Sequence, residues 1–400
     1  MSEVEEEVRD GYKEVRLGPK TVEIPEQWDI SLIKEVADVK YGKSLPDEGE
    51  IPAVGSSGVF DYVCEELIRE TTLVVGRKGS AGEVYLLKEP CWPSDTTFYL
   101  DGFDHSRIHI GFLYYFMNQF SLAKELEQTT IPSLDRSRLE TYRIPTPSLP
   151  EQRRIADILS TVDEQIRQTD EIIERTEELR RGLMTEFFHS GYYQHSTIER
   201  PQFGQVPENW DICELSEVAD IEMGSSPKSK YYNEEGDGLP FYQANNEFGY
   251  RNPSHDRWCS KPNKTADEGD TLVTIRGTYV GQVNVATEQC CIGRGLAAIS
   301  AEKVDQEYLY HHLAHRERYV KSIASGSTFD SINSTELETL SVLVPPREEQ
   351  EKIASCLKKL QEKYMAERRH KETLQELKHG LMQDLLTGKV RVDDLDFSGE

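Results

Sequence analysis

The segment Ile24–Ile30, IPEQWDI, returns 182 residues later as Val206–Ile212, VPENWDI. Because a long internal period redefines the architecture of a chain, this repeat is the first feature to interpret. The block EVAD also occurs twice at the same offset, as Glu35–Asp38 and Glu217–Asp220. The sequence therefore predicts a tandem duplication.

Later blocks continue the repeat at offsets of 199 and then 198. At 199 we align Leu73-Val74, Arg77 and Gly82 with Leu272-Val273, Arg276 and Gly281; at 198 we align Leu139–Thr141 and Glu151-Gln152 with Leu337–Thr339 and Glu349-Gln350. Between the matched blocks, residues 45–72 and 227–271 share almost nothing. A scaffold repeated with unlike insertions indicates two similar domains that do the same kind of work on different targets.

Each copy closes with a long amphipathic segment, in which apolar residues recur three or four apart and so form one stripe of a helix. Each helix is expected to begin after a proline, Pro150 or Pro346, and to run about 38 residues, or roughly 57 Å. Because neither stripe can stay exposed, we expect the two helices to pack as an antiparallel pair. Packing of each helix on its own domain alone is less favoured, since the helix exceeds a small domain's width.

The helix-pair interface is predicted to contain Ile155, Leu159, Val162, Ile166, Leu183, Ile353, Leu357, Leu360, Tyr364 and Leu381. Leu179 and Leu377 also fall on the stripes. Thr169 and Thr176 fill seam positions poorly, which predicts that the coiled coil is loosest at its middle.

The predicted fold class is α+β: two similar mixed α/β domains separated by two long antiparallel, coiled-coil helices. Thr72–Val75 and Thr271–Ile275 have the pattern of strands, whereas Phe112–Gln119 and Tyr308–Tyr319 have that of helices. The expected boundaries are 1–148 for the first domain, 149–190 for the central helix, 191–345 for the second domain, 346–390 for the C-terminal helix and 391–400 for a tail.

Composition narrows the class of protein. No apolar run approaches the roughly 18 residues of a membrane span, and the acidic start, Met1–Asp10, lacks the pattern of a secretory signal, so a cytoplasmic protein without membrane partners is expected. The seven cysteines include no CxxC pair, which favours reduced thiols and no zinc or other metal site.

The net charge of −26 argues by itself against binding to nucleic acid, because lysine and arginine normally supply that affinity. Acid spread evenly along the chain is also typical of a protein from a high-salt cytoplasm, where a Debye length of about 3 Å at about 1 M salt screens repulsion from phosphates. A halophilic source is therefore a hypothesis. Folding measured against KCl tests it, and equal stability in dilute buffer would contradict it.

The chain resembles the specificity subunits of Type I restriction-modification enzymes over nearly its whole length. The resemblance is carried by PPREEQ at Pro345–Gln350, by GLMQDLLTGKV at Gly380–Val390 and by the entry block with Pro207 and Trp210. Gly326–Thr328 ahead of Ile332-Asn333 also looks like the family's loop before its last strand. The first copy keeps weaker versions at Pro147–Gln152 and Gly182–Met184.

The resemblance implies two target recognition domains, each reading one half of a split, asymmetric site on double-stranded DNA, with the paired helices as a ruler. It implies two methyltransferase subunits and, through them, restriction-translocase subunits as partners. S-adenosylmethionine, ATP and Mg are then expected in those partners, and this chain is expected to hold no cofactor. A rigid spacer with unlike heads would suit a non-palindromic target.

Residues that read DNA should be polar or basic and should lie on the loops that differ between the copies. Amides can pair with adenine and arginine can fork onto guanine. The candidates are Lys43, Ser56, Ser57, Arg77, Lys78 and Ser80 in the first copy, and Lys228, Lys230, Tyr231, Gln243, Asn245, Asn246, Arg276, Thr278 and Tyr279 in the second. Arg77 and Arg276 are the strongest pair, because the repeat aligns them with each other.

Other motifs have plainer interpretations. Ala37–Ser44 only loosely fits a phosphate-binding loop, and the second copy lacks its lysine. His311, His312 and His315 suggest a structural cluster more than a metal site, and Trp28 and Trp210 favour core packing over base stacking. Since we find no catalytic arrangement, and the methyltransferase signature is missing at Asn252–Ser254, the chain is expected to be non-catalytic. A coiled-coil adaptor that binds no DNA is the main alternative, and a phosphate-loop enzyme is a third.

Overall fold

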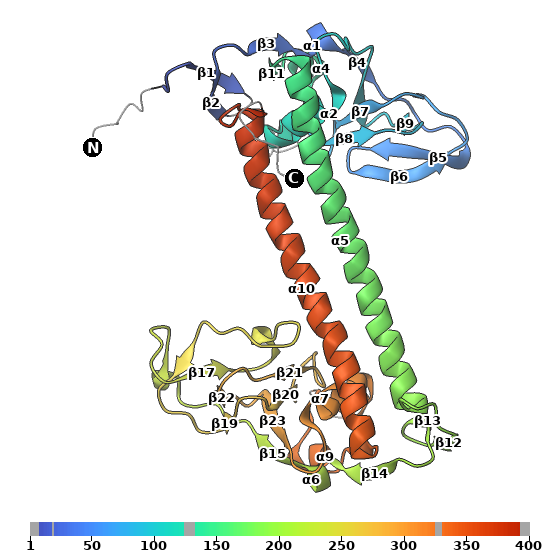
Figure 1. Ribbon diagram of the computed structural model, residues 1–400, viewed down its shortest axis with the longest axis vertical. Coiled ribbons are helices and arrows are strands. Elements are labelled where there is room, and N and C mark those ends of the chain that lie inside the picture. The colour runs from blue at the N-terminus through green and yellow to red at the C-terminus, as the bar shows by residue number, and fades with distance from the viewer. Residues whose placement is uncertain (1–7, 18–19, 124–132, 325–329, 393–400) are drawn as a thin grey trace, which may run out of the picture. The chain divides into compact units, whose positions relative to one another are not determined.

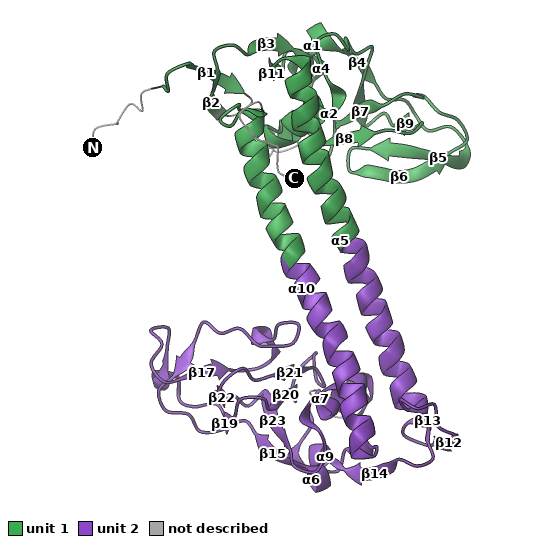
Figure 2. Cartoon of the chain, viewed as in Figure 1, with its two compact units in different colours: residues 1–169, 370–400 green, residues 170–369 purple. Residues whose placement is uncertain are grey.

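The computed structural model describes residues 8–17, 20–123, 133–324 and 330–392. Contacts within the chain divide it into two compact units (Figure 2). Unit 1 comprises residues 1–169 and 370–400, and unit 2 comprises residues 170–369. Both long helices therefore contribute residues to each unit, and the domain boundaries set out above remain a prediction.

Unit 1 contains one mixed α/β domain and parts of both long helices (Figure 1). Its elements are β1 (Tyr12–Leu17), β2 (Lys20–Pro25), β3 (Asp29–Leu32), α1 (Ile33–Val36), β4 (Asp38–Tyr41), β5 (Glu48–Gly55), β6 (Gly58–Val63), β7 (Thr72–Gly76), β8 (Val84–Leu87), β9 (Trp92–Pro93), β10 (Thr97–Asp101), α2 (Ile110–Gln119), α4 (Arg136–Glu140), β11 (Arg143–Thr146) and the first half of α5 (Leu149–Ser190). The main sheet has the antiparallel order β4-β10-β7-β8, and a smaller sheet has the order β6-β5-β9.

Unit 2 repeats this plan with a larger insertion. Its elements are β12 (Thr197–Arg200), β13 (Gly204–Pro207), β14 (Asp211–Glu214), α6 (Leu215–Val218), β15 (Ala219–Met223), η1 (Ser229–Tyr231), β16 (Tyr232–Asn233), β17 (Leu239–Tyr242), η2 (Asn245–Glu247), β18 (Trp258–Cys259), β19 (Thr265–Ala266), β20 (Thr271–Thr274), β21 (Val283–Val285), β22 (Cys290–Ile292), β23 (Leu296–Ala301), α7 (Gln306–His315), α8 (Glu317–Ala324), α9 (Ser334–Glu338), β24 (Ser341–Val344) and half of α10 (Arg347–Leu386). The main sheet, β15-β23-β20-β21, has the topology of the main sheet in unit 1.

The duplicated fold class is therefore shown, with local differences from the prediction. The helix expected over Tyr308–Tyr319 is two helices, α7 and α8, which separate at Arg316. The strand expected to reach Ile275 ends at Thr274. Helix α5 begins at Leu149, so Pro150 lies in its first turn, where a missing N–H costs nothing. The long helices have 42 and 40 residues.

The repeated tryptophans lie in the cores. Trp28 is 1% exposed, in a cluster with Ile24 and Phe112. Trp210 is 4% exposed and packs with Tyr308 and Leu357. Core packing, rather than base stacking, is thus the role of both.

In unit 1, the start of α5 packs on the end of α10. Ile155 and Leu159 share an apolar cluster with Met382 and Leu385, so the two segments run antiparallel there. Lys378 of α10 also lies 2.6 Å from the Asp163 carboxylate of α5. An apolar stripe closed by a charge pair is the arrangement that the heptad pattern indicates.

In unit 2, the opposite halves of the same helices meet. Met184 and Phe187 of α5 pack with Ile353 and Leu357 of α10, again antiparallel. Of the ten predicted interface residues, Ile155, Leu159, Val162, Ile353 and Leu357 are buried, and Ile166, Leu183, Leu360, Tyr364 and Leu381 are half-buried.

Two positions of the predicted stripes are wrong. Leu179 and Leu377 are 51% and 49% exposed, whereas Thr176 is buried. The ideal helix advances about 100° per residue, so a stripe read as three-or-four spacing drifts around the helix over many turns. Whether the middle of the pair is its loosest part stays a prediction.

Candidate nucleic-acid interface

A groove of about 1110 Å³ opens in unit 2 beyond the end of β20. Its walls are Gln243-Ala244, Arg276–Thr278, Arg294-Gly295 and Asp330-Ser331. These four segments follow β17, β20 and β22 and precede α9, so residues up to about ninety positions apart in sequence come together. Loops carried by a rigid sheet are the usual place for recognition residues.

The backbone around Arg294 is held at every neighbouring position. Its own N–H donates to Ser226 Oγ at 3.1 Å, and the N–H of Gly293 donates to the Tyr242 carbonyl at 2.8 Å. The N–H of Ile275 donates to the Gly295 carbonyl at 2.8 Å. A Cβ at Gly293 or Gly295 would come within 2.9 Å or 2.7 Å of the Gln243 backbone, so only glycine fits on either side.

The side chains in this groove offer hydrogen-bonding groups to a ligand. Gln243 donates from Nε2 to Ser226 Oγ at 3.0 Å, which orients its amide. Arg276 and Arg294 are exposed, and within the described chain neither guanidinium has a carboxylate within 4.0 Å. Two unpaired guanidiniums and an amide can hold phosphates and base edges.

The strand ladders show which residues of the two units are equivalent. In unit 1, Leu100 pairs with Val39 on one side and with Leu73 on the other. In unit 2, Ile299 pairs with Ile221 and with Thr271. Because Val39 and Ile221 directly follow the repeated EVAD blocks, Leu73 corresponds to Thr271.

The alignment of Arg77 with Arg276 is therefore wrong by one residue, and Lys78 is the counterpart of Arg276. Lys78 bridges to Ser133 just as Arg276 bridges to Ser331. The next residues, Gly79 and Gly277, have φ of 76° and 92°. Strands β7 and β20 are buried on both faces, so the alternation that normally sets register is missing from the sequence.

In unit 1, loops at the corresponding end of the sheet bring predicted residues together. Ser56 and Ser57 form the tip of the hairpin β5–β6. A Cβ at Gly79 would lie 3.4 Å from Ser56 Oγ, so the loop that carries Lys78 and Ser80 lies against that tip. Lys78, Ser80 and Ser57 are exposed.

Arg77 and Lys43 lie beside this group. The Arg77 guanidinium donates to the Asp95 carbonyl at 3.1 Å and lies 5.2 Å from the centre of the Tyr41 ring. Lys43 is exposed and its backbone bridges to Ser94. Arg77 is thus partly engaged by its own unit, whereas Lys78 is the more available cation.

A family model for the "Type I restriction modification DNA specificity domain" matches residues 25–178 and 207–376, which are the two copies of the repeat. The chain belongs to the type I restriction-modification specificity subunits. The resemblance drawn from its motifs is confirmed, as are two target recognition domains.

Relatives of this specificity subunit match over almost their full length. The putative type I restriction enzyme MjaX specificity subunit of Methanocaldococcus jannaschii is 30% identical, over 96% of this chain and 97% of the relative. The MjaVIII specificity subunit of the same organism is 25% identical, over 94% and 95%.

Solved structures share the fold. The crystal structure of the S subunit from M. genitalium has a TM-score of 0.69 at 19% identity, covering 93% of this chain and 98% of that one. A chain from a study of complex assembly and conformational transition of the type I R-M system has a TM-score of 0.54 at 25% identity, covering 92% and 99%.

The predicted residues of unit 2 fall into three groups. Gln243, Arg276 and Thr278 line the groove. Around it, Asn245 donates to Gln282 at 3.5 Å, and Asn246 and Tyr279 are exposed. Lys228, Lys230 and Tyr231 do not line it: Lys228 precedes η1, and Lys230 and Tyr231 lie in it, with the Lys230 ammonium 4.9 Å from the centre of the Tyr231 ring.

Arg294, Asp330 and Ser331 line the groove but were not predicted. The run Gly-Arg-Gly at Gly293–Gly295 is a signal that could have found Arg294, because glycines on both sides indicate close backbone packing beneath an exposed side chain. The family motif at Gly326–Thr328 lies outside the described residues.

The histidine cluster of the specificity subunit is buried. His311 and His312 are fully buried, and His311 Nε2 lies 3.2 Å from the Glu307 carboxylate. Burial lowers the pKa of His311 and His315. No group of three potential metal ligands occurs among the described residues. The structure agrees with the structural interpretation of this cluster.

The phosphate-loop interpretation of Lys43 fails on its surroundings. The preceding strand, β4, pairs antiparallel at the side of the main sheet, and the chain continues into β5 rather than into a helix. A phosphate-binding loop needs a helix N-terminus directly after the glycine-rich turn. Nucleotide binding at this position is therefore not supported.

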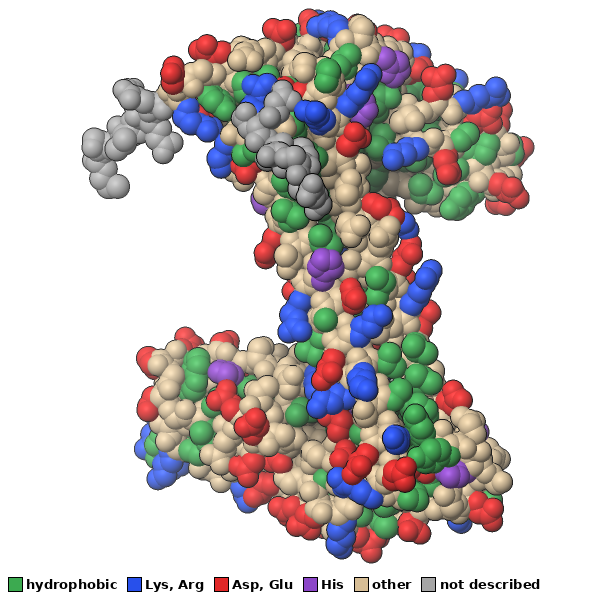
Figure 3. All heavy atoms as spheres, viewed as in Figure 1, with side chains coloured by type: hydrophobic (Ala, Val, Ile, Leu, Met, Phe, Trp, Pro, Cys, Tyr) green, Lys and Arg blue, Asp and Glu red, His purple; other side chains and the backbone are tan. Residues whose placement is uncertain are grey.

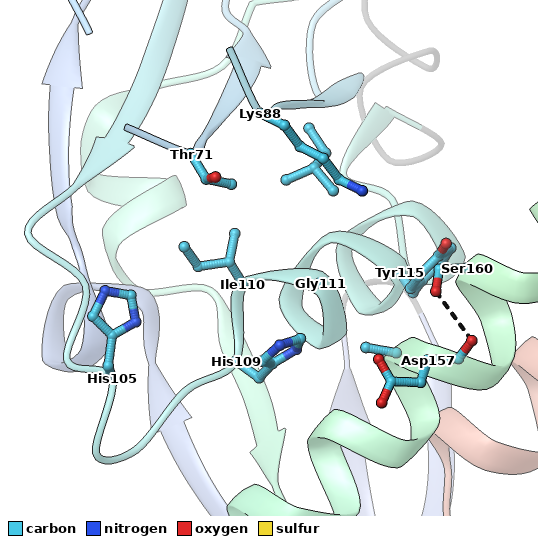
Figure 4. A pocket seen from close by; sticks show the side chains of 11 residues that line it. Thr71, Lys88, His105, His109, Ile110, Gly111, Tyr115, Asp157 and Ser160 are labelled. Atoms are coloured by element: carbon cyan, nitrogen blue, oxygen red, sulfur yellow. Dashed lines mark hydrogen bonds between the residues drawn. The ribbon is translucent and has the colours of Figure 1, made fainter. Parts of the chain in front are cut away.

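Unit 1 has a separate pocket of about 420 Å³ between α2 and α5. Figure 4 shows His109, Asp157 and Ser160 along it, with Ser160 Oγ donating to the Asp157 carbonyl. His109 Nδ1 accepts the Phe112 N–H at 3.4 Å as the cap of α2, and burial lowers the pKa of His109. His109 and Ser160 thus bond to the backbone of their own helices, and the pocket shares no residue with the recognition loops.

Two general features accompany this site. No helix among the described residues is long and apolar enough to cross a membrane. All seven cysteines are free thiols, and Cys91, Cys259, Cys290 and Cys291 are buried.

Proposed function

We propose that this specificity subunit reads a bipartite, asymmetric DNA site, with one recognition domain for each half-site. The observation that carries the proposal is the groove of unit 2, where Arg276 and Arg294 are exposed without a carboxylate partner in the described chain. In a chain with a net charge of −26, uncompensated guanidiniums on one groove favour an anionic ligand.

The two units support unlike half-sites. They share a sheet topology and an antiparallel helix pair, while their segments 45–72 and 227–271 differ in sequence and length. A common scaffold holds each set of loops in the same geometry, and different side chains on it read different bases.

Overall acidity bears on affinity rather than on specificity. On the face seen in Figure 3, lysine and arginine side chains lie among acidic ones in both units. Since few phosphate contacts mean a weak electrostatic contribution, we infer that tight binding needs the partner subunits.

We further propose two methyltransferase subunits and, through them, restriction-translocase subunits as partners. Chemistry would then belong to those partners: S-adenosylmethionine would supply the methyl group, and ATP with Mg would drive translocation. This chain would hold its partners on the site and catalyse no step.

Sequencing of methylated bases in a host with and without this gene tests the function. A bipartite methyladenine motif that disappears on deletion is the expected result. The acidity of the chain favours one alternative, a coiled-coil adaptor that binds no DNA. An unchanged set of methylated motifs, together with failure of the assembled complex to bind DNA, would support that adaptor.

A further inference from the structure

Asp95 and Arg294 occupy the same backbone position in the two units. Just before them, the N–H of Ser94 donates to the Val54 carbonyl at 2.9 Å, and the N–H of Gly293 donates to the Tyr242 carbonyl at 2.8 Å. Just after them, Thr96 and Gly295 accept from the residues that follow β7 and β20, Arg77 and Ile275, at 2.9 Å and 2.8 Å. The two residues are therefore structural counterparts with opposite charge.

The neighbours of this position keep their chemistry between the units. Lys78 occupies the backbone position that corresponds to Arg276, and Ser80 the position that corresponds to Thr278. A cation and a hydroxyl therefore recur. Ser133 likewise corresponds to Ser331. Groups that recur in domains with different targets suit the phosphate backbone, which is the same in every sequence.

Position 95/294 changes most in charge among the described counterparts of the groove. Both side chains are exposed, and in the described chain neither the Asp95 carboxylate nor the Arg294 guanidinium has an ion-pair partner. A carboxylate is repelled by phosphates, so in a bound groove Asp95 would be favourable where it meets a hydrogen-bond donor. On DNA that donor is the amino group of a base.

We propose that Asp95 and Arg294 are the specificity-determining pair of this subunit, one in each recognition domain. Arg294 presents a forked donor to O6 and N7 of a guanine, whereas Asp95 accepts from N4 of a cytosine. The inference rests on the proposed function and adds which position distinguishes the half-sites and which base each residue selects.

The test uses the complete complex with its methyltransferase subunits and oligonucleotide libraries in which each half-site is varied base by base. Arg294→Lys keeps the charge but removes the fork, and Arg294→Ala removes both. We expect both variants to lose roughly ten- to a hundredfold of discrimination at one base pair of one half-site, with the other half-site unchanged. Asp95→Asn should relax one base pair in the other half-site.

Matched controls are Lys303→Ala and Glu89→Ala, which remove exposed charges away from these loops. They should leave base preference unchanged. A uniform loss of methylation on all sequences in the Arg294 variants would identify a phosphate contact and overturn the proposal, as would unchanged base preference. In both cases the proposed function would stand, because it fails only if the unsubstituted complex shows no bipartite motif.

Discussion

Trp210 donates its indole N–H to the Glu349 carboxylate at 3.0 Å, inside the core of unit 2. The same carboxylate accepts the Tyr192 N–H at 2.8 Å and lies 3.0 Å from His195 Nε2. Glu349 stands near the start of α10, where a negative charge is favourable, and His195 follows the end of α5. The carboxylate therefore joins the start of one long helix to the segment that leaves the other.

In unit 1 an ion pair makes the corresponding connection between the two long helices. Glu151, near the start of α5, pairs with Arg391, which follows the end of α10, through contacts of 2.7 Å and 3.0 Å. Both carboxylates are buried. The repeated Glu-Gln of the sequence thus marks an anchoring point for the helix pair in each unit.

Glu349→Ala should destabilise unit 2 by about 1–3 kcal/mol, because it leaves the buried indole N–H of Trp210 without its acceptor and also removes the acceptor of the Tyr192 N–H. Urea denaturation followed by tryptophan fluorescence measures this loss. Glu348→Ala is the matched control, since Glu348 is exposed and accepts from the Tyr193 hydroxyl. Equal effects of the two substitutions would show that the anchor contributes nothing special.

Arg251→Ala should weaken the packing of residues 227–271, the divergent segment of unit 2, against α7 and α10. Arg251 donates to the Glu307 carboxylate at 2.6 Å and 2.7 Å, and to Gln361 of α10 at 2.6 Å. Since these groups are mostly buried, a loss of about 2–3 kcal/mol is expected. Hydrogen exchange should rise around Tyr250, whose hydroxyl donates to Glu177.

The control for the contacts of Arg251 is Arg257→Ala, which removes an exposed arginine of the same segment, residues 227–271. It should leave exchange near Tyr250 unchanged. Equal hydrogen exchange in the Arg251 variant and the parent protein would contradict the prediction that Arg251 holds this segment against α7 and α10.

The stability of unit 2 should depend on pH through His312. Burial, with the nearby charges of Arg316 and His315, lowers the pKa of His312 well below its usual 6.5. The unfolded chain therefore binds a proton below about pH 6.5 that the folded chain does not. The contribution of His312 to stability is complete above that pH and falls as the pH drops.

His312→Phe should reduce this dependence by about 1.4 kcal/mol per pH unit, the effect of one proton. Phenylalanine is the natural comparison, because Phe116 holds the corresponding place in α2. Urea denaturation at a series of pH values gives the slope. A slope identical to that of the parent protein would rule out His312 as the group that titrates.

Lys78→Ala and Arg276→Ala should each weaken DNA binding by the assembled complex on all sequences alike. Each variant should also lower the slope of log K against log salt by about 1, as expected for loss of one phosphate contact. Titration of labelled DNA at several salt concentrations measures both effects. Arg77→Ala should have a smaller effect, since the Arg77 guanidinium already donates to the Asp95 carbonyl within its own unit. A larger effect of Arg77→Ala than of Lys78→Ala would contradict Lys78 as the phosphate contact of unit 1.

The sequence by itself determined the duplication, the α+β class, the two long helices and the family. These follow from features that are local or periodic along the chain, such as the IPEQWDI and EVAD blocks and apolar residues spaced by a helical turn. Burial of Trp28 and Trp210 was predictable for the same reason, because both lie in blocks common to the two copies.

Only the tertiary structure decided the register of the strands and which residues line the groove. Strands β7 and β20 are buried on both faces, so no alternation along them could show that Lys78, not Arg77, matches Arg276. Arg294 joins Arg276 and Gln243 through hydrogen bonds between segments far apart in sequence. Such contacts depend on how strands pair across the sheet, and a pattern read along one strand carries no information about its partner.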